Sequence, residues 1–541
     1  MKLKKILLRL GTENLIKFID TLVFNVLRLR GSKIINEKNL TEIVLKLNSE
    51  KNLLSEKGSR ELIIGALKSE EAKLICKLFD IGDKNPWDNI NKINFKKKKN
   101  LDLLLKLFEL DTSNKISIDS SEDKTNPLII SPNYSLFFHQ IDVLDKVNKL
   151  LNKPIKKALL HMPTGSGKTR TAINLICDYL KLNTDSLVVW LAHTEELCQQ
   201  AHDEFNKGWG IIGNRNIKSY KLFKNHRCDL NDIKNGFVVL SLDYAYSLTK
   251  KEQGKFFSFA RKCGFVVMDE AHMSVAPTYK LVLDILVNKS TKLLGLTATP
   301  GRAAIGEEEN KKLAIFYNKQ KATLKIKGYK TPIHFLQDKG YLAKIKQEPL
   351  ETSISDIKKI FSNAEIKAEL KRIKNGMDIS KEFIKKLSSD GKRIQMIIDK
   401  AISENKNPNN KIIIFAGAIY PANAIYKILQ MENINCCLVT GETNLIERRN
   451  NIELFKQEKS NMNIIINYGV LTTGFDAPKA NVAIIGRPTQ SVTLYSQMVG
   501  RVMRGKKAGG KKECKVVTVK DPIYGFRDMS QSFTYWEELW K

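Results

Sequence analysis

The stretch LLHMPTGSGKTRTAINLI, residues 159–176, carries the clearest chemical potential in the sequence. An apolar run ends in the turn GSG at 165–167, and helical spacing resumes after Lys168 and Thr169. A glycine-rich turn lets backbone N–H groups surround a phosphate at a helix N-terminus. Lys168 would add a positive charge for the β and γ phosphates, and Thr169 a hydroxyl for Mg²⁺. We therefore predict a nucleotide site, although Met162 replaces the first glycine of the phosphate-loop pattern.

A second chemical feature is the segment FVVMDEAH, an apolar run that ends in Asp269, Glu270 and His272. A carboxylate at the end of a strand can hold Mg²⁺ through water, and a neighbouring carboxylate can orient and deprotonate an attacking water. We assign Asp269 to the metal and Glu270 to the general base. A solvated acidic loop would rarely follow so apolar a run.

Composition narrows the classes of partner. The chain has 90 Lys and Arg against 58 Asp and Glu, a formal net charge of +32. This excess favours a polyanionic partner, although a generally lysine-rich proteome explains it as well. The eight cysteines contain no C-x-x-C pair, which argues against a disulfide framework or zinc ribbon and fits a reducing cytoplasm. No apolar run reaches membrane-spanning length, so we expect no membrane association.

The elements that must position these residues fall into about three domains, because 541 residues are too many for one core. Residues 15–29 place apolar side chains on one helical face, and a second helix is expected to start at Ser69. The polar stretch 111–127 reads as a linker. We predict a small all-helical N-terminal accessory domain at 1–125.

Beyond the linker, short apolar runs rich in β-branched residues alternate with helical segments, which is typical of a parallel sheet covered by helices. The first set is KALLHM, SLVVWLA, GFVVLS, FVVMDE and KLLGLTAT, and it predicts an ATP-binding α/β domain at 126–345. A charged, largely helical stretch follows to about residue 408. The alternation then returns in KIIIFAG, NCCLVTG, MNIIINYG, NVAIIGRP and CKVVTVKD, so 346–541 should hold a helical connector and a second α/β domain.

Five segments in order resemble motifs of the DEAD/DEAH-box helicases and translocases of superfamily 2, over roughly residues 133–541. These segments are LAHTEEL from Leu191 (motif Ia), DEAH at 269–272, LTATP at 296–300 (motif III), LTTGFDAP at 471–478 (motif V) and QMVGRVMR at 497–504 (motif VI). The resemblance implies an α/β fold of two RecA-like parallel-sheet domains in tandem, with ATP and Mg²⁺ between them.

The resemblance also implies roles for individual residues. Arg501 and Arg504, three apart and on one face if helical, would reach the γ-phosphate from the second domain as arginine fingers. Gln140 would read adenine. The nucleotide site would comprise Thr164, Gly165, Ser166, Gly167, Lys168, Thr169, Gly474 and Asp476, and the metal ligands would be Thr169 and Asp269. Coupling residues would be His272, Thr297, Thr299 and Gln497, and strand contacts His193, Thr194, Ser241, Thr472 and Thr473.

The basic segment at 311–330 holds seven lysines between the two sheet domains. Lys321, Lys325 and Lys327 are candidates for an added strand contact, and a solvated lysine face is an equal alternative.

The motif combination looks most like bacterial DNA helicases of repair, restriction and anti-phage systems. We therefore expect an ATP-dependent DNA helicase or translocase, which would need a partner such as a nuclease, bound through the N-terminal domain, for any cutting. An RNA helicase and a nucleotide-dependent DNA clamp remain alternatives.

Overall fold

A computed structural model describes residues 2–29, 36–48, 50–95, 98–108, 134–301, 307–326, 328–374, 377–458, 460–471, 475, 477–489, 491–522 and 540. The chain divides into two compact units. One combines Met1–Ile129 with Ser389–Ser403 and Ile419–Cys436, and the other holds the rest of the chain, including both sheets. The polar stretch 111–127 and the predicted boundary at 125 lie outside the described residues.

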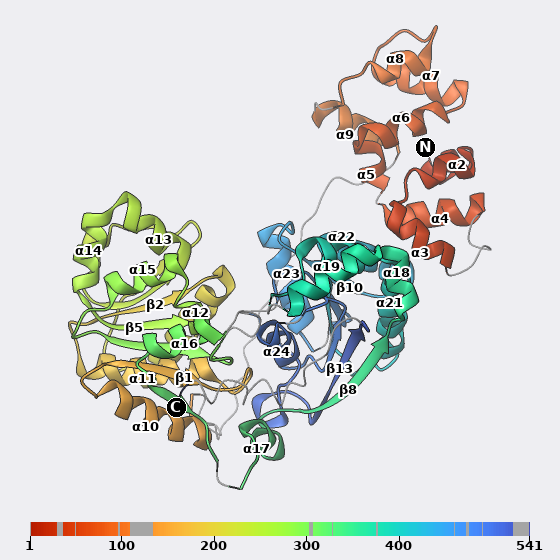
Figure 1. Cartoon of the computed structure of the whole chain (residues 1–541). Helices are drawn as coiled ribbons and strands as arrows, with labels where there is room; N and C mark the ends of the chain where they lie inside the picture. The colour runs from red at the N-terminus through yellow and green to blue at the C-terminus, as the bar shows by residue number, and fades with distance from the viewer. Residues whose placement is uncertain are drawn as a thin grey trace, which may run out of the picture. The chain divides into compact units, whose positions relative to one another are not determined.

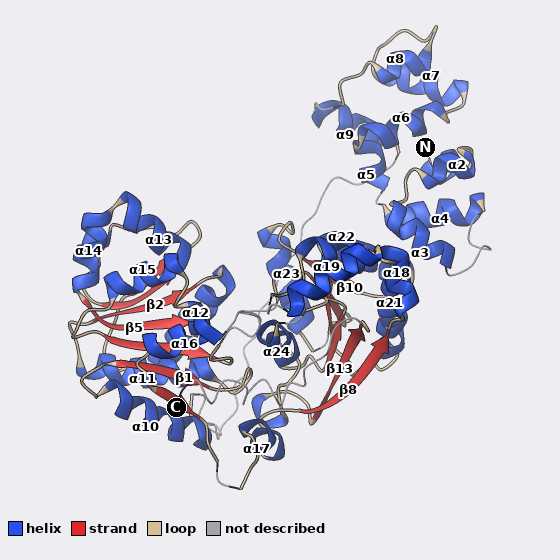
Figure 2. Ribbon diagram, in the orientation of Figure 1, coloured by secondary structure: helices blue, strands red, loops and turns tan. Residues whose placement is uncertain are grey.

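The first sheet has seven strands in the order β3-β4-β2-β5-β6-β1-β7, and its printed pairings are all parallel. Figure 1 labels β1, β2 and β5 of this sheet, and Figure 2 shows helices on both of its faces. The strands are β1 (Lys157–His161), β2 (Leu187–Ala192), β3 (Ser219–Leu222), β4 (Gly236–Ser241), β5 (Cys263–Asp269), β6 (Lys292–Thr297) and β7 (Lys321–Thr323).

Two helical layers bury the faces of this sheet because its strands are apolar on both sides. In β2, Val188 and Trp190 pack into the cluster formed with α10, α11 and α12, whereas Val189 and Leu191 face α13, α14 and α15. The helices are α10 (Phe138–Leu151), α11 (Lys168–Leu182), α12 (Glu195–Ile212), α13 (Leu242–Lys251), α14 (Gln253–Arg261), α15 (Pro277–Leu286), α16 (Glu307–Phe316) and α17 (Pro332–Asp338).

The second sheet has the order β10-β11-β9-β12-β13-β8. The pairs β11–β9, β9–β12, β12–β13 and β13–β8 are parallel, so these strands end at the same edge. Its elements are β8 (Lys344–Glu351), β9 (Ile412–Phe415), β10 (Cys436–Val439), α23 (Leu445–Lys456), β11 (Ile464–Asn467), β12 (Val482–Ile485), α24 (Val492–Gly500) and β13 (Glu513–Lys520). The prediction of two parallel sheets in tandem, with a helical region before them, is confirmed.

Three helices are inserted after β8: α18 (Ile354–Ile360), α19 (Asn363–Lys374) and α20 (Lys381–Ser388). They enclose a separate small core in which the rings of Phe361 and Phe383 stack at 3.8 Å. This insertion accounts for much of the charged, helical stretch expected after residue 350.

The other unit is helical in its described part. Helix α22 (Ile419–Met431) packs against α3 and α4, and the Tyr420 hydroxyl donates to the Asp20 carboxylate at 2.7 Å. The remaining helices are α1 (Leu3–Leu7), α2 (Gly11–Ile16), α3 (Thr21–Leu29), α4 (Glu37–Leu47), α5 (Glu50–Ser55), α6 (Lys57–Gly65), α7 (Ser69–Leu78), α8 (Pro86–Asn91), α9 (Lys98–Leu107) and most of α21 (Gly391–Asn405).

The two helix predictions for this region have different outcomes. The start of a helix at Ser69 is confirmed. A single amphipathic helix over 15–29 is wrong, because α2 ends at Ile16 and Asp20 accepts from the Leu22 N–H at the start of α3. Leu29 is 62% exposed and is not part of the buried face.

Candidate functional site

The phosphate-loop segment connects β1 to α11 through two glycines that need their lack of a side chain. Gly165 and Gly167 have φ angles of +84° and +91°, a region that disfavours other residues. A Cβ on Gly167 would lie 2.1 Å from Nε2 of Gln140. That amide nitrogen donates to the Ser166 carbonyl at 3.1 Å. The loop is therefore held by the first turn of α10.

Lys168 is the first residue of α11, and its side chain turns back into the loop. The ammonium donates to the Met162 carbonyl at 3.2 Å and to the Pro163 carbonyl at 3.4 Å. Burial lowers its pKa to about 8, opposed by the negative charges of Glu270 and Asp269. Met162 contributes only its carbonyl to this bond, so a side chain there leaves the Lys168 contact intact. Thr169 follows in the first turn of α11.

Gln140 is buried, and both ends of its amide are engaged. Its Oε1 accepts from the Phe137 N–H at 2.8 Å, and its Nε2 holds the Ser166 carbonyl. Tyr341 lies beside this segment, with its ring 4.6 Å from that of Phe137. Recognition of adenine by Gln140 stays a prediction. In the structure the same side chain also holds the phosphate loop through the Ser166 carbonyl.

Asp269 ends β5, and Glu270 follows in the left-handed region at φ +49°. Such a conformation costs about 1–3 kcal/mol for a residue with a side chain and is common at functional sites. The Glu270 N–H donates to Asp269 Oδ1 at 3.0 Å. Burial, together with the Glu270 charge, raises the pKa of Asp269. Burial alone would raise the pKa of Glu270. The hydrogen bond and charge of His272 and the charge of Lys168 outweigh burial and lower this pKa, so the ionised form of Glu270 is favoured.

Short polar side chains connect this carboxylate to the second sheet. Nδ1 of His272 lies 3.3 Å from Oε2 of Glu270 and 3.5 Å from the Thr297 hydroxyl. The Thr297 hydroxyl donates to the Thr299 carbonyl at 2.8 Å. The Thr299 hydroxyl in turn accepts from the hydroxyl of Thr493 at 3.1 Å. Because Thr493 is on α24, three of the predicted coupling residues, His272, Thr297 and Thr299, form a path to the helix in which motif VI begins.

Motif VI meets the phosphate loop directly. The Arg504 guanidinium donates to the Gly165 carbonyl, and Gly500 lies so close to Thr164 that a Cβ there would sit 2.2 Å from Thr164 Cγ2. The Arg501 guanidinium instead donates to the Phe475 carbonyl. The two arginines would share a face only within a helix, and this condition is not met, because α24 ends at Gly500 and Arg504 forms a β-bridge with Leu342. Gln497 is half-buried on α24.

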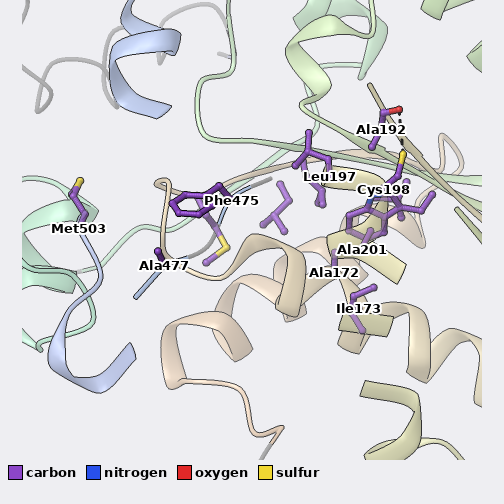
Figure 3. Packing of buried hydrophobic residues seen from close by; sticks show 14 of the residues in the cluster. Ala172, Ile173, Ala192, Leu197, Cys198, Ala201, Phe475, Ala477 and Met503 are labelled. Carbon is purple, nitrogen blue, oxygen red and sulfur yellow. Dashed lines mark hydrogen bonds between the residues drawn. The ribbon is translucent and has the colours of Figure 1, made fainter. Parts of the chain in front are cut away.

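Apolar packing also joins the two sheets, because one buried cluster contains side chains from both. Within it the Cys198 thiol donates to the Ala192 carbonyl at 3.8 Å. Figure 3 labels Ala172, Ile173, Ala192, Leu197, Cys198, Ala201, Phe475, Ala477 and Met503 from this cluster.

Three residues predicted to contact a nucleic-acid strand lie at one edge of the first sheet. His193 follows β2, Thr194 accepts from the Leu197 N–H as the cap of α12, and Ser241 ends β4 in register with Ala192. Burial lowers the pKa of His193, and the charge of Glu270 opposes this shift. The predicted residues Thr472, Thr473, Gly474 and Asp476 lie outside the described residues.

The basic segment at 311–330 belongs to the first sheet domain along part of its length and does not simply bridge the two sheets. Lys321 opens β7, pairs in register with Leu159 and is half-buried, with its ammonium 5.5 Å from the Trp540 ring. Lys325 is exposed in the loop beyond β7, and Lys327 lies outside the described residues. A contact of these lysines with a nucleic-acid strand stays a prediction.

The sequence alone did not reveal several contacts between the two sheet domains. Arg448 on α23 donates to the Glu196 carboxylate of α12 at 2.9 Å and to the Thr440 carbonyl at 2.9 Å. The residues Thr440 and Gly441 and the basic residues after them were the sequence features that could have indicated this contact. Nothing in the sequence identifies Glu196 as the partner of Arg448. Thr493 is likewise one hydroxyl among several in α24.

The tandem sheets, with a phosphate loop in the first and arginines of the second against it, define a protein of the RecA-like helicase class. Residues 133–302 match the model for the type III restriction enzyme res subunit, and residues 392–506 match the helicase conserved C-terminal domain. The chain belongs to the superfamily 2 helicases and translocases.

The relatives are distant. The helicase-family protein IRC3 of Saccharomyces cerevisiae is 25% identical over 68% of this chain and 49% of its own length. Helicase 22 of Sulfolobus islandicus filamentous virus is 25% identical over 65% of this chain and 58% of its own length. QP509L of African swine fever virus, named as an ATP-dependent RNA helicase, is 31% identical over 32% of this chain and 30% of its own. The chain thus spans about half the length of the first two relatives.

Solved structures agree on the fold. The helicase MrfA bound to DNA superposes with a TM-score of 0.51 at 16% identity, covering 71% of this chain and 49% of MrfA. The type ISP restriction-modification enzyme LlaBIII bound to DNA gives 0.50 at 16% identity, covering 76% of this chain and 29% of LlaBIII.

Among the described residues, no group of three or more His, Cys, Asp or Glu side chains is arranged to hold a metal ion. No helix in the same part of the chain is long and apolar enough to cross a membrane.

Proposed function

We propose that this protein is an ATP-dependent helicase or translocase that moves along DNA. The observation that carries the proposal is the contact of Arg504, from the second sheet domain, with the Gly165 carbonyl of the phosphate loop. An arginine at this place can stabilise transition-state charge only while the two domains are together. Hydrolysis would therefore depend on the arrangement of the two domains, which is the property that a motor requires.

The residues present fit ATP and Mg²⁺. Gly167 has no room for a Cβ and leaves a backbone cradle at the N-terminus of α11, with the Lys168 ammonium inside the loop. The Thr169 hydroxyl and the Asp269 carboxylate are oxygen donors of the kind that Mg²⁺ prefers. When bound, Mg²⁺ would neutralise negative charge that develops on the phosphates. Lys168 would hold the phosphates, and Glu270, favoured in its ionised form, would accept a proton from the attacking water.

The path from Glu270 through His272, Thr297 and Thr299 to Thr493 supports a coupling mechanism. Each step is a contact of 3.5 Å or less, so a shift of α24 would change the contacts that position Glu270, the proposed general base. In the other direction, a change in the contact of Arg504 with the Gly165 carbonyl would let α24 move. His193 and Thr194 at the end of β2 and Ser241 at the end of β4 would report strand binding at the same edge.

DNA is the proposed polymer because the motif set looks most like that of DNA helicases, and two solved structures of similar fold are bound to DNA. A relative named as an RNA helicase keeps RNA as the competing substrate. A clamp that binds DNA without unwinding it is the third outcome. The N-terminal helical unit would serve as an accessory domain that docks a partner, such as a nuclease or a subunit of a defence system.

The test is ATP turnover by the full chain with no nucleic acid, with single-stranded DNA and with single-stranded RNA of matched length. Stronger stimulation by DNA, together with displacement of a labelled strand or of a bound streptavidin block, supports a DNA motor. Stronger stimulation by RNA would replace it with the RNA helicase. Turnover without displacement of either obstacle would identify the clamp. The Glu270→Gln variant, which keeps the fold but lacks the base, is the matched control.

A further inference from the structure

The helical insertion α18–α20 is the feature of the second sheet domain that the site does not use. It leaves the sheet where β8 ends at Glu351, and the Thr352 hydroxyl contacts the end of β13 through the Lys520 carbonyl at 3.1 Å. It returns at Ser388, whose hydroxyl lies where a Cβ on Gly417 would be. Gly417 follows β9. Both ends of the insertion are therefore at the carboxyl edge of the sheet.

A nucleic-acid strand would pass along that edge of the sheet. In open parallel sheets ligands bind outside the carboxyl ends of the strands. Leu471, the first residue of motif V, follows β11 at the same edge, because β11 and β9 are parallel. A Cβ on Gly417 would also be 3.5 Å from Pro488, which follows β12. The insertion is therefore anchored among the loops that face the proposed nucleic-acid path.

The insertion is basic, and three of its lysines lie along one side of α19. Residues 354–388 contain nine Lys and Arg against five Asp and Glu. Lys367, Lys371 and Lys374 follow one another at intervals of four and three residues on α19, which places them along one side of the helix. All three are exposed, and the described residues include no ion-pair partner for any of them. We call these three side chains the lysine row.

Nearby acidic residues do not cancel this charge. The Glu365 carboxylate lies 2.8 Å from the Lys386 ammonium. Glu369 is buried and accepts from the Ser380 N–H at 2.7 Å and from the Ser380 hydroxyl at 2.8 Å. Both carboxylates thus have partners within the insertion, whereas the lysine row is exposed. A row of free ammonium groups at helical spacing suits a phosphate backbone.

We propose that α18–α20 is a second nucleic-acid contact, in which the lysine row binds the phosphates of a single strand beyond the motif contacts. This inference rests on the proposed function. The separate core of the insertion, with Phe361 stacked on Phe383, lets it present α19 as a rigid arm on the second sheet domain. The arm would move with that domain during each cycle and would hold the strand while the first sheet domain releases it.

The experiment measures binding of a single-stranded DNA oligonucleotide to the full chain over a salt series, by fluorescence anisotropy. The test variant changes the lysine row to glutamine, and a second variant changes it to arginine, which keeps the charge. A charge-matched control changes three lysines of the same spacing that lie before β1, at the amino edge of the first sheet. These control residues are Lys149, Lys153 and Lys156.

Each lysine–phosphate contact contributes about 0.7 to the log–log salt slope, so the glutamine variant should flatten the slope by up to about two units. Between 50 and 200 mM salt, its affinity should then fall roughly 15-fold less than that of the wild type. The arginine variant and the amino-edge control should keep the wild-type slope, and ATP turnover without DNA should be unchanged in all three.

A glutamine variant with the slope of the amino-edge control would overturn the lysine row as a contact while leaving the motor intact. A loss shared by the arginine variant would overturn it too, since shape and not charge would then be responsible. If the wild type shows no salt-dependent binding to DNA or to a matched RNA, the proposed function fails together with this inference.

Discussion

Replacing Gly500 with alanine adds one carbon atom at the contact between the two sheet domains and so tests whether that contact is needed for catalysis. Gly500 is the last residue of α24, and a Cβ there would lie 2.2 Å from Thr164 Cγ2 and 2.6 Å from Thr164 Cβ. Carbon atoms at rest are about 3.5–4.0 Å apart, so the domains must separate by at least about 1.3 Å at this point. Alanine is a better helix former than glycine by about 1 kcal/mol, so the substitution should not weaken α24 itself.

The consequence for catalysis follows from the position of Arg504. This residue reaches the Gly165 carbonyl from the segment after α24, so it would be displaced together with Gly500. A misplacement of about 1 Å in a catalytic group can cost about 100-fold in rate. We therefore expect single-turnover hydrolysis by Gly500→Ala to fall about 100-fold, with ATP affinity nearly unchanged because Lys168 and the glycines of the loop are untouched.

Single-turnover hydrolysis and equilibrium binding of labelled ATP are the two assays. Gly210→Ala is the control, because Gly210 is exposed in α12 and a Cβ there would meet nothing within 4 Å. A double mutant supplies the sharper test: in a Thr164→Gly background the obstructing atoms are gone, and Gly500→Ala should then cost little. A wild-type rate in Gly500→Ala, or an equal loss in both backgrounds, would refute the reasoning.

Four further outcomes are expected. Lys168→Ala should abolish phosphate release, since the described loop offers the phosphates no other lysine, and retained turnover would contradict this. Glu270→Gln should bind ATP in a filter assay but fail to turn it over, trapping a nucleic-acid complex; near-normal turnover would remove the base assignment. Arg504→Ala should slow single-turnover hydrolysis by about 10³ to 10⁵, and Arg501→Ala should behave similarly, whereas an unchanged rate would argue against a finger. Thr493→Val should keep basal hydrolysis but lose stimulation by nucleic acid, and full stimulation would show that the Thr299 hydrogen bond is dispensable.

The sequence predicted the sheets well because their central strands are buried on both faces. Runs such as VVW in β2 and III in β9 are too apolar to be anything but core. The strands that the sequence did not reveal are short or charged. β7 has three residues, and β8, KIKQEPLE, lies at the end of its sheet order and exposes much of its length. Local apolar pattern does not identify a strand whose partner alone defines it.

Contacts between distant segments were harder still to predict. The sequence placed Lys168, Asp269 and Arg504 in functional motifs, because each motif is local. It could not show that 389–403 and 419–436 join the N-terminal helices, or that Arg448 pairs with Glu196, because such contacts depend on how segments hundreds of residues apart pack. The charge of Arg448 would have suited a phosphate equally well.

The path from Glu270 to Thr493 is sensitive to small separations of the two sheet domains. Its links are a histidine and three threonines, whose short side chains leave little freedom to follow a moving partner. The Thr493–Thr299 hydrogen bond of 3.1 Å would be lost once the two domains moved apart by about 1 Å, which is less than the separation that Gly500→Ala would impose. Because binding free energies are reciprocal, any factor by which nucleic acid strengthens ATP binding must equal the factor by which ATP strengthens nucleic-acid binding. If this path carries the coupling, breaking Thr493 from Thr299 must lower this shared factor and leave the affinity for each ligand alone unchanged, whereas a fall in the affinity for one ligand alone would place the damage in that ligand's own site.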